Sequence, residues 1–472
     1  MTFWDFNSWG IINILAILFL GLILANILKR SVGFIKKSLV PTSVLGGIIL
    51  LLISTVYKIC TDELFFNLNF FGGNGVGVDG EMGVLEVITY HALALGFISS
   101  ALKISAKKLT GKRSVEIFDS GVTTVAGYLI QGVVGLGITI IASFVVSGFF
   151  PAAGIILPFG YGQGTGQALN YGTMFQQNNG FKGGSNFGLT IAALGFLSAS
   201  IGGVIHLNVM KKKGRFTAKQ GDNRVIALEK IENPNEISMS GDMDKFTAQI
   251  IFISIAYFLT YLAMWGLGSL MPGMKATIYG FNFLLGVIFA SLLKVVLKIL
   301  NKKNIVKKQY INNFLLNRIS NTCFDIMIVA GIAAIDITLI ADYWGILLIL
   351  GVAGLVVTYI YNMIVAKTLF KEYADEQFLA MYGMLTGTAS TGVMLLREID
   401  PEFKTPVQDN LVYQTLPAIL FGFPIMLIAP MTPDRPYLIL VLLIVFFTVL
   451  NVILFRSKLF PKLFKNKENK SE

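Results

Sequence analysis

The chain has 472 residues, of which 54% are hydrophobic and only 14% are charged, with a formal net charge of +11. A water-soluble chain of this length has about a quarter charged residues, so the composition excludes an ordinary soluble protein. Two cysteines and two histidines exclude a disulfide framework and most zinc chemistry. The basic residues lie just beyond the ends of apolar segments, which is typical of cytoplasmic membrane loops rather than of a nucleic-acid surface.

Eleven apolar segments are long enough to cross about 30 Å of hydrocarbon. In chain order they are 10–28, 40–57, 84–102, 118–149, 187–209, 246–271, 278–300, 320–341, 343–366, 410–431 and 436–456. Two further apolar stretches, 152–175 and 376–396, contain many glycine and hydroxyl residues. The pattern predicts an all-α polytopic membrane protein.

The distribution of lysine and arginine predicts the topology. With the N-terminus outside and both interrupted stretches re-entrant, 34 of the 38 Lys and Arg residues lie inside. Only Lys58, Lys182, Lys275 and Arg435 then lie outside. The positive-inside rule favours this arrangement, which also puts the C-terminus in the cytoplasm.

A hydrophilic segment at 211–245 divides the chain and is predicted to be a cytoplasmic linker. Before it, residues 1–210 hold five spans and the re-entrant loop 152–175. After it, residues 246–431 hold five spans and the re-entrant loop 376–396, and 432–472 add one more span and a basic tail. Because five is odd, the second half begins with the opposite orientation, so a duplication would be an inverted repeat.

The two interrupted stretches share a motif. Residues 161–168 and 382–389 both read Tyr-Gly-x-x-Thr-Gly-x-Ala, at an offset of 221 residues. Closely spaced glycines disfavour a regular helix, and irregular backbone in a membrane is tolerated only inside the protein or beside a wet cavity. Freed N–H groups at a helix N-terminus favour carboxylates, and freed carbonyl and hydroxyl oxygens suit sodium. The alternative is close helix packing through small residues.

Several other polar residues are candidates for a site. Asp325 lies in the predicted span 320–341, and Asp336 lies eleven residues later at nearly the same helical angle. Arg397 follows the second interrupted stretch and could attract an anion. A weak alignment of the two halves pairs His91 with Asp325.

The chain resembles the bacterial sodium/glutamate symporter family over about residues 10–430. The first re-entrant loop of that family reads Gly-Gly-His-Gly-Thr-Gly-Ala-Ala. The matching positions here are Gly162, Gly164, Thr165, Gly166 and Ala168, with further similarity at Pro41, Val44, Gly46, Gly47, 94–96 and 188–203. The chain departs from the family at Gln163, which replaces His, at Gln167, which replaces Ala, at 387–392, and at Asp325, where the family tends to have Ser.

The resemblance implies ten core spans in two inverted five-span repeats, and a homodimer in a bacterial inner membrane with an elevator-like mechanism. We therefore expect sodium-coupled symport of glutamate or a related small carboxylate, with no enzymatic activity, no cofactor and no nucleic-acid partner. The predicted substrate-binding residues are Gln163, Gly164, Thr165, Gly166, Gln167, Gly387, Thr388, Ser390 and Thr391. The predicted ion-coupling residues are Asp325, Asn321 and Ser99.

Three alternative functions stay open. A proton-coupled carrier could use Asp325 and His91. A channel would need no coupling ion. A membrane-embedded enzyme could use paired aspartates, but Asp325 and Asp336 on one helix would be about 16 Å apart, too far to share a proton.

Overall fold

The structure is a computed structural model that describes residues 2, 4–37, 39–77, 81–104, 111–213, 243–305, 308–400 and 404–459. All the elements in these ranges are helices. Most of the predicted linker (214–242) and the end of the predicted basic tail (460–472) lie outside the described residues.

Among the described residues, ten helices are long and apolar enough to cross a membrane, so the chain is an all-α multi-pass membrane protein. They are α1 (Phe6–Ser31), α3 (Thr42–Thr61), α4 (Val84–Leu102), α5 (Gly111–Val145), α8 (Gly184–Lys212), α9 (Lys245–Leu270), α11 (Asn282–Lys302), α12 (Asn313–Ala333), α13 (Trp344–Leu369) and α18 (Pro436–Leu454). Each of them overlaps one of the eleven predicted spans.

The predicted span 410–431 is the exception. It is divided into α16 (Val407–Tyr413) and α17 (Thr415–Ile428), which is too short to count among the ten spanning helices. Gln414 lies between the two helices, is 1% exposed, and has its side-chain oxygen 3.3 Å from the Thr124 hydroxyl of α5. Pro417 has no N–H to donate to the carbonyl of Tyr413, so the helical hydrogen bonding is interrupted here, which a hydropathy average over the segment does not show.

The remaining elements are short. The α-helices are α2 (Gly33–Lys37), α10 (Lys275–Gly280) and α19 (Arg456–Leu459). The 3-10 helices are η1 (Phe65–Asn67), η2 (Asn69–Phe71), η3 (Pro151–Ile155), η4 (Pro272–Met274), η5 (Ile337–Tyr343), η6 (Lys371–Tyr373) and η7 (Ala429–Met431).

Both glycine-rich stretches are broken helices, as predicted. The first consists of α6 (Ile156–Gln163) and α7 (Thr165–Asn179), which meet at Gly164. The second consists of α14 (Ala374–Leu385) and α15 (Ala389–Arg397), separated by residues 386–388. Gly164 has φ +84° and ψ −171°, a conformation in which a side chain would be strained. We call residues 163–165 the first break and residues 386–388 the second break.

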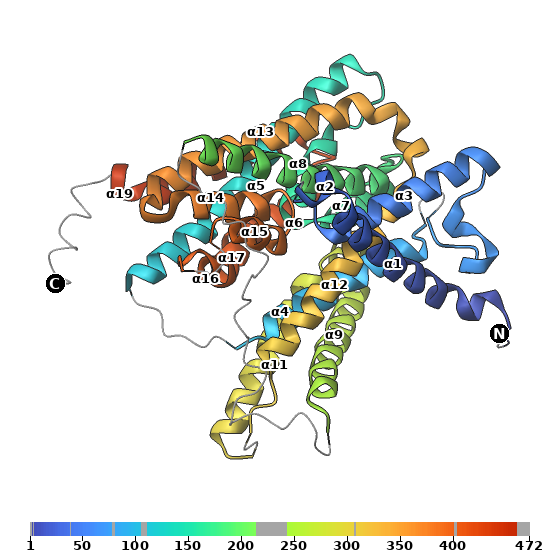
Figure 1. Cartoon of the computed structure of the whole chain (residues 1–472), viewed down its shortest axis with the longest axis horizontal. Coiled ribbons are helices and arrows are strands. Elements are labelled where there is room, and N and C mark those ends of the chain that lie inside the picture. The colour runs from blue at the N-terminus through green and yellow to red at the C-terminus, as the bar shows by residue number, and fades with distance from the viewer. Residues whose placement is uncertain are drawn as a thin grey trace.

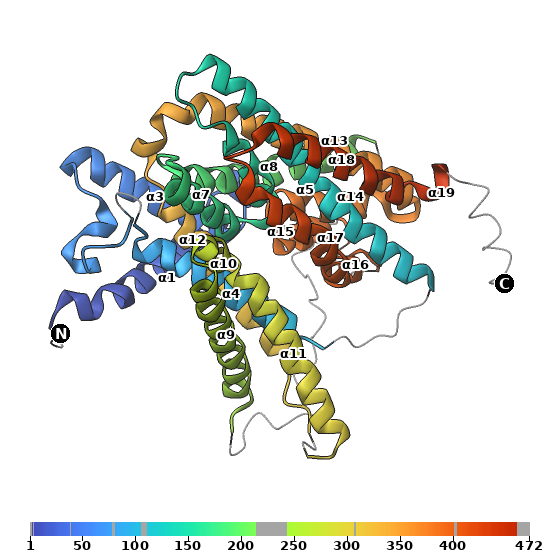
Figure 2. The same ribbon diagram turned by 180° about the vertical axis from the view of Figure 1, so that it is seen from behind.

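The spanning helices form two groups (Figures 1 and 2). In the first group, α4 packs along α12 at the centre. Helix α3 packs on α12 and α11 packs on α4, while α1 packs on α3 and α9 packs on α11. The second group contains α5, α13, α8, α18 and both broken helices. Helix α7 contacts α4, α10 and α12 as well as α8, so the first broken helix lies between the two groups.

Helix α8 carries glycines at seven-residue spacing, and residues seven apart lie on the same face of a helix. Gly188 faces the backbone oxygen of Ala168 in α7, Gly195 faces α6 and the second break, and Gly202 faces the ring of Tyr382 in α14. A side-chain carbon at Gly188 would lie 2.2 Å from that oxygen. The glycine face therefore lets both broken helices approach the α8 backbone closely.

The C-terminal helix α18 packs along α5. Arg456 forms an ion pair of 2.6 Å with Asp119 of α5, and the Tyr361 hydroxyl of α13 donates to Asn451 of α18 at 3.0 Å. The predicted additional span is thus part of the second helix group rather than a separate anchor.

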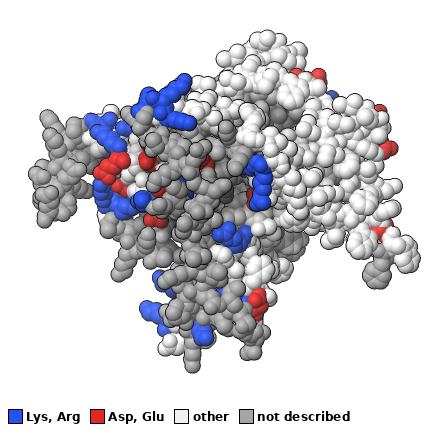
Figure 3. All heavy atoms as spheres, viewed as in Figure 1, with Lys and Arg blue, Asp and Glu red and all other residues white. Residues whose placement is uncertain are grey.

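Lysine and arginine gather on one face of the molecule (Figure 3). Basic residues occur in the last turns of α1, α8, α11 and α13, and these ends lie on the same side because successive spans alternate in direction. We call this side the basic face. Its residues include Lys29, Arg30, Lys211, Lys302 and Lys367.

We predict that Gly188→Ala lowers the free energy of unfolding by about 1–3 kcal/mol, because the new methyl group would collide with the backbone of Ala168. Thermal unfolding of the purified protein in detergent measures the effect. The matched control is Gly266→Ala in α9, where no atom lies within 4 Å of the added carbon. This control should be neutral or stabilising by up to about 1 kcal/mol. Equal melting temperatures for the two variants would contradict the close packing on α8.

Candidate functional site

The two breaks lie against each other, although they belong to opposite halves of the chain. A side-chain carbon built on Gly164 would lie 3.6 Å from the Thr388 methyl group and 3.9 Å from the Phe196 ring. A carbon built on Gly387 would lie 3.1 Å from the same ring. Phe196 of α8 therefore contacts both breaks and marks the point where they meet.

The tyrosines that begin the two repeated motifs bind the same residue of α8. The Tyr382 hydroxyl donates to the backbone oxygen of Ser198 at 2.8 Å. The Tyr161 hydroxyl donates to the Gly351 carbonyl at 2.6 Å, which leaves the Ser198 hydroxyl to donate to Tyr161 at 2.9 Å. Both tyrosines are completely buried. The shared motif thus attaches both broken helices to Ser198.

The first break is rich in hydrogen-bond donors. The side-chain nitrogens of Gln163 and Gln167 are buried and have no protein partner, and Gln167 as a whole is 1% exposed. Helix α7 begins here, and its N-cap, Gly164, has no side chain that could accept from the first N–H groups. A buried donor without a partner costs about 1–3 kcal/mol, and the dipole of α7 adds positive potential at the same place.

The second break is rich in oxygen atoms. The Thr388 hydroxyl caps α15, where it accepts from the Thr391 N–H at 3.4 Å and lies 3.3 Å from the Thr391 hydroxyl. The Thr386 hydroxyl donates to the Tyr382 carbonyl at 2.6 Å. Hydroxyl oxygens such as these keep lone pairs that a hard cation can use.

Most of the predicted binding residues belong to these two breaks or to the turns beside them. Thr165 donates to the Met327 carbonyl of α12 at 3.2 Å, and Gly166 packs against Leu93 of α4. The side chain of Ser390 lies outside the described ones. The structure brings Gly164 and Thr388 together, while the binding role of the whole set stays a prediction.

The predicted ion-coupling residues lie elsewhere. Asp325 and Asn321 are on an exposed side of α12, and Ser43 of α3 is hydrogen-bonded to Asp325. Met327, two residues after Asp325 and therefore about 200° around the helix, faces the first break. Ser99 is buried in α4 and donates to the Leu95 carbonyl of its own helix at 2.7 Å.

The expected placement of Asp325 and Asp336 on one helix is wrong. Helix α12 ends at Ala333, and Asp336 caps the next turn, where it accepts from the Thr338 N–H at 3.0 Å. Asp336 is 6% exposed and forms a 2.7 Å ion pair with Lys58 of α3. Its own N–H donates to Asn186 of α8 at 2.5 Å. These contacts join the two helix groups on the face opposite the basic face.

Two further residues of the site region were not identified from the sequence. Ser198 gives no signal, because one serine in an apolar span is unremarkable. Gln131 in α5 could have been noticed as a polar residue within a long apolar segment. Its side-chain nitrogen donates to the Thr358 hydroxyl and to the Leu385 carbonyl, both at 2.8 Å. Gln131 therefore binds the carbonyl at the end of α14, next to the second break.

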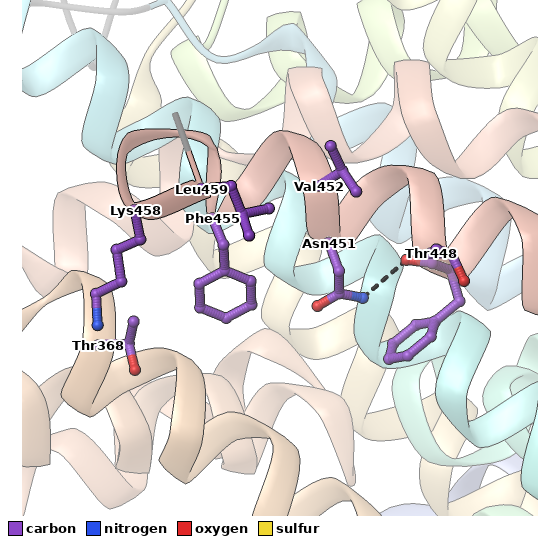
Figure 4. Close-up of a pocket in the computed structure, with 8 residues that line it drawn as sticks. Thr368, Thr448, Asn451, Val452, Phe455, Lys458 and Leu459 are labelled. Atoms are coloured by element: carbon purple, nitrogen blue, oxygen red, sulfur yellow. Dashed lines mark hydrogen bonds between the residues drawn. The ribbon is translucent and has the colours of Figure 1, made fainter. Parts of the chain in front are cut away.

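A cavity of about 590 Å³ lies away from the breaks, between α13 and α18 (Figure 4). Phe447 and Phe455 line it, and Lys458 and Thr368 lie together at one end. Its lining is mostly apolar and comes from helices at the surface, so it does not offer the converging polar groups of a solute site.

The sequence matches no protein-family model and no curated protein. The resemblance to the sodium/glutamate symporter family therefore depends on the order and spacing of the motifs alone.

We predict that Tyr161→Phe lowers the free energy of unfolding by about 1–3 kcal/mol, because it removes hydrogen bonds to Ser198 and Gly351. Tyr382→Phe removes one hydrogen bond and should cost about half as much. Thermal unfolding in detergent checks both variants. Tyr437→Phe, at a residue that is 60% exposed, is the control. If Tyr161→Phe and Tyr382→Phe both unfolded like the control and the wild type, the attachment of the broken helices to Ser198 would be refuted.

Proposed function

We propose that the chain is a secondary active transporter that carries glutamate or a related small carboxylate together with sodium. The observation that carries the proposal is the pair of buried, unpartnered amide nitrogens of Gln163 and Gln167 beside a second helix break. Irregular backbone in a membrane protein is tolerated only where protein buries it or it lines a wet cavity, and broken helices of this kind form the solute sites of many carriers.

The donors at the first break suit a carboxylate. Two amide groups and the start of α7 offer N–H donors at the positive end of a helix dipole. Hydrogen bonds to a charged acceptor contribute more than those between neutral groups, and burial strengthens them further. Residues 161–168 contain no acidic side chain that would repel an anion.

The oxygens at the second break suit sodium. Residues 382–392 contain four hydroxyl side chains besides that of Tyr382, and no group that titrates near neutral pH. A proton carrier would require such a group. A hard cation requires only oxygen ligands, which the Thr386 and Thr388 hydroxyls and the freed carbonyls can supply.

The pairing of helices supports an inverted repeat of residues 1–210 and 246–431. Under this correspondence α4 is the mate of α12 and α5 is the mate of α13, and each packs against its mate. Helix α3 corresponds to α11, and the contact of α3 with α12 matches that of α11 with α4. Helix α1 corresponds to α9, and the contact of α1 with α3 matches that of α9 with α11. The broken helices α6–α7 and α14–α15 then correspond as re-entrant loops.

The departures from this symmetry support an alternating-access mechanism. Helix α7 packs against α4 and α12, whereas Ala389 at the start of α15 and the α12 residues Asn321 and Asp325 are exposed. The Lys58–Asp336 pair joins the groups on the opposite face. We infer a carrier open toward the basic face, with that face in the cytoplasm of a bacterial cell. Movement of the second group against the first, in a homodimer, would open the other side in an elevator-like way.

Proton coupling through Asp325 and His91 is the second candidate. His91 of α4 is 2.6 Å from the Tyr257 hydroxyl of α9, while Asp325 is hydrogen-bonded by Ser43 of α3. Neither contact involves the breaks, which favours sodium. The channel alternative differs from both carriers, because a channel would conduct its solute without a coupling ion. The enzyme alternative loses support because Asp336 is paired with Lys58.

We predict that a sodium gradient drives uptake of radiolabelled glutamate into proteoliposomes, and that Gln167→Leu weakens the apparent affinity about 10- to 100-fold. The loss of a hydrogen bond to a charged acceptor, about 1.5–3 kcal/mol, is the reason. Gln177→Leu, an exposed position ten residues further along α7, is the control and should transport normally.

A panel of competing amino and dicarboxylic acids would identify the carboxylate. Uptake should also persist in Asp325→Asn. Uptake that followed a pH gradient, needed no sodium and failed in Asp325→Asn would establish the proton-coupled alternative instead. A carrier that responded to neither sodium nor any carboxylate would contradict the proposal.

A further inference from the structure

A second, smaller cavity lies at the basic face. It has a volume of about 220 Å³ and is formed by the end of α8, the end of α13 and the start of α14. Its polar lining consists of His206, Lys213, Tyr359, Lys367 and Asp375. None of these residues belongs to the two breaks, so the cavity is separate from the proposed transport site.

The lining of this cavity favours an anion. Lys213 and Lys367 supply two positive charges against the single carboxylate of Asp375. The His206 ring is 4% exposed, and its Nδ1 atom is 3.1 Å from the Tyr359 hydroxyl. Its Nε2 atom lies 3.5 Å from an Asp375 oxygen and makes no hydrogen bond to the protein. His206 therefore faces Asp375 at the wall of the cavity, and the two lysines leave the cavity with an excess of positive charge.

The volume limits the size of the ligand. At roughly 30 Å³ for each water molecule, 220 Å³ corresponds to about seven waters. Sites for drug-sized molecules start at about 300 Å³. A phosphate group with a few attached atoms fits this space, and a nucleotide or another large cofactor does not.

The surface beside the cavity is apolar and exposed. Helix α8 presents Ile201, Ile205 and Val209 at four-residue spacing, and α13 presents Val356, Ile360 and Ile364 in the same way. The two helices pack together, and Val209 belongs both to this surface and to the cavity lining. Acyl chains could therefore lie along the two stripes while a head group entered the cavity.

We propose that this cavity binds the phosphate head group of an anionic phospholipid, with the acyl chains along the α8 and α13 stripes. Basic pockets between membrane helices on the cytoplasmic side are suited to such head groups. Both the lysines and the stripes are needed in this arrangement, because the lysines alone would also attract a soluble phosphate. Helix α14, which begins beside Asp375 and ends at the second break, would be held by the bound lipid.

The test is lipid binding by the purified full-length protein in neutral detergent, measured by native mass spectrometry and by thermal unfolding. Phosphatidylglycerol should bind at least tenfold more tightly than phosphatidylcholine and should raise the melting temperature. The double variant Lys213→Gln/Lys367→Gln should lose at least tenfold in affinity for phosphatidylglycerol. Without lipid, this variant should unfold at the same temperature as the wild type, because both lysines are exposed.

Two controls make the assignment specific. Lys458→Gln removes a cation from the cavity between α13 and α18 and should leave phosphatidylglycerol binding unchanged (Figure 4). Inorganic phosphate and glycerol phosphate, added alone, should not reproduce the rise in melting temperature. Full stabilisation by inorganic phosphate would overturn the lipid in favour of a soluble anion. Equal binding of the two lipids, or equal losses in Lys458→Gln and the double variant, would overturn the site.

Discussion

The attachment of both broken helices to α8 is the constraint on which the rest of the structure depends. Interrupted backbone cannot face lipid, since its N–H and C=O groups would lack partners, so it must be enclosed by protein or line a wet cavity. Helix α8 provides that enclosure. In its most apolar window 67% of residues are buried, the highest share among the ten spanning helices, and Ser198 receives the tyrosines of both repeated motifs. The glycine face beside Ser198 makes the close contact sterically possible.

This arrangement explains why two chemically different breaks end at one place. Tyr161 and Tyr382 attach each broken helix to α8, and Phe196 contacts both breaks beside the point where they meet. One break presents amide nitrogens and the other presents hydroxyl oxygens. In the proposed co-transport of an anion and a cation, each bound ion would stabilise the other across these adjacent surfaces.

The sequence predicted the features that depend on local composition. Ten spans follow from the length of apolar segments, and the breaks follow from clustered glycines. The contact at Ser198 could not be predicted, because it joins residues far apart in the chain and gives no local pattern. The span 410–431 was predicted as continuous because hydropathy averaging hides Pro417, which cannot donate to the carbonyl four residues before it. The placement of Asp325 and Asp336 on one helix was wrong because the helix ends at Ala333.

The measurement that tests the central claim most directly is an experimental structure of the protein with sodium and a transported carboxylate bound. The account predicts density for the carboxylate within hydrogen-bonding distance of the Gln163 and Gln167 side chains, at the start of α7. It also predicts a cation beside the oxygens of residues 386–388. A carboxylate bound instead on the Asp325 side of α12, or in the cavity between α13 and α18, would contradict the account.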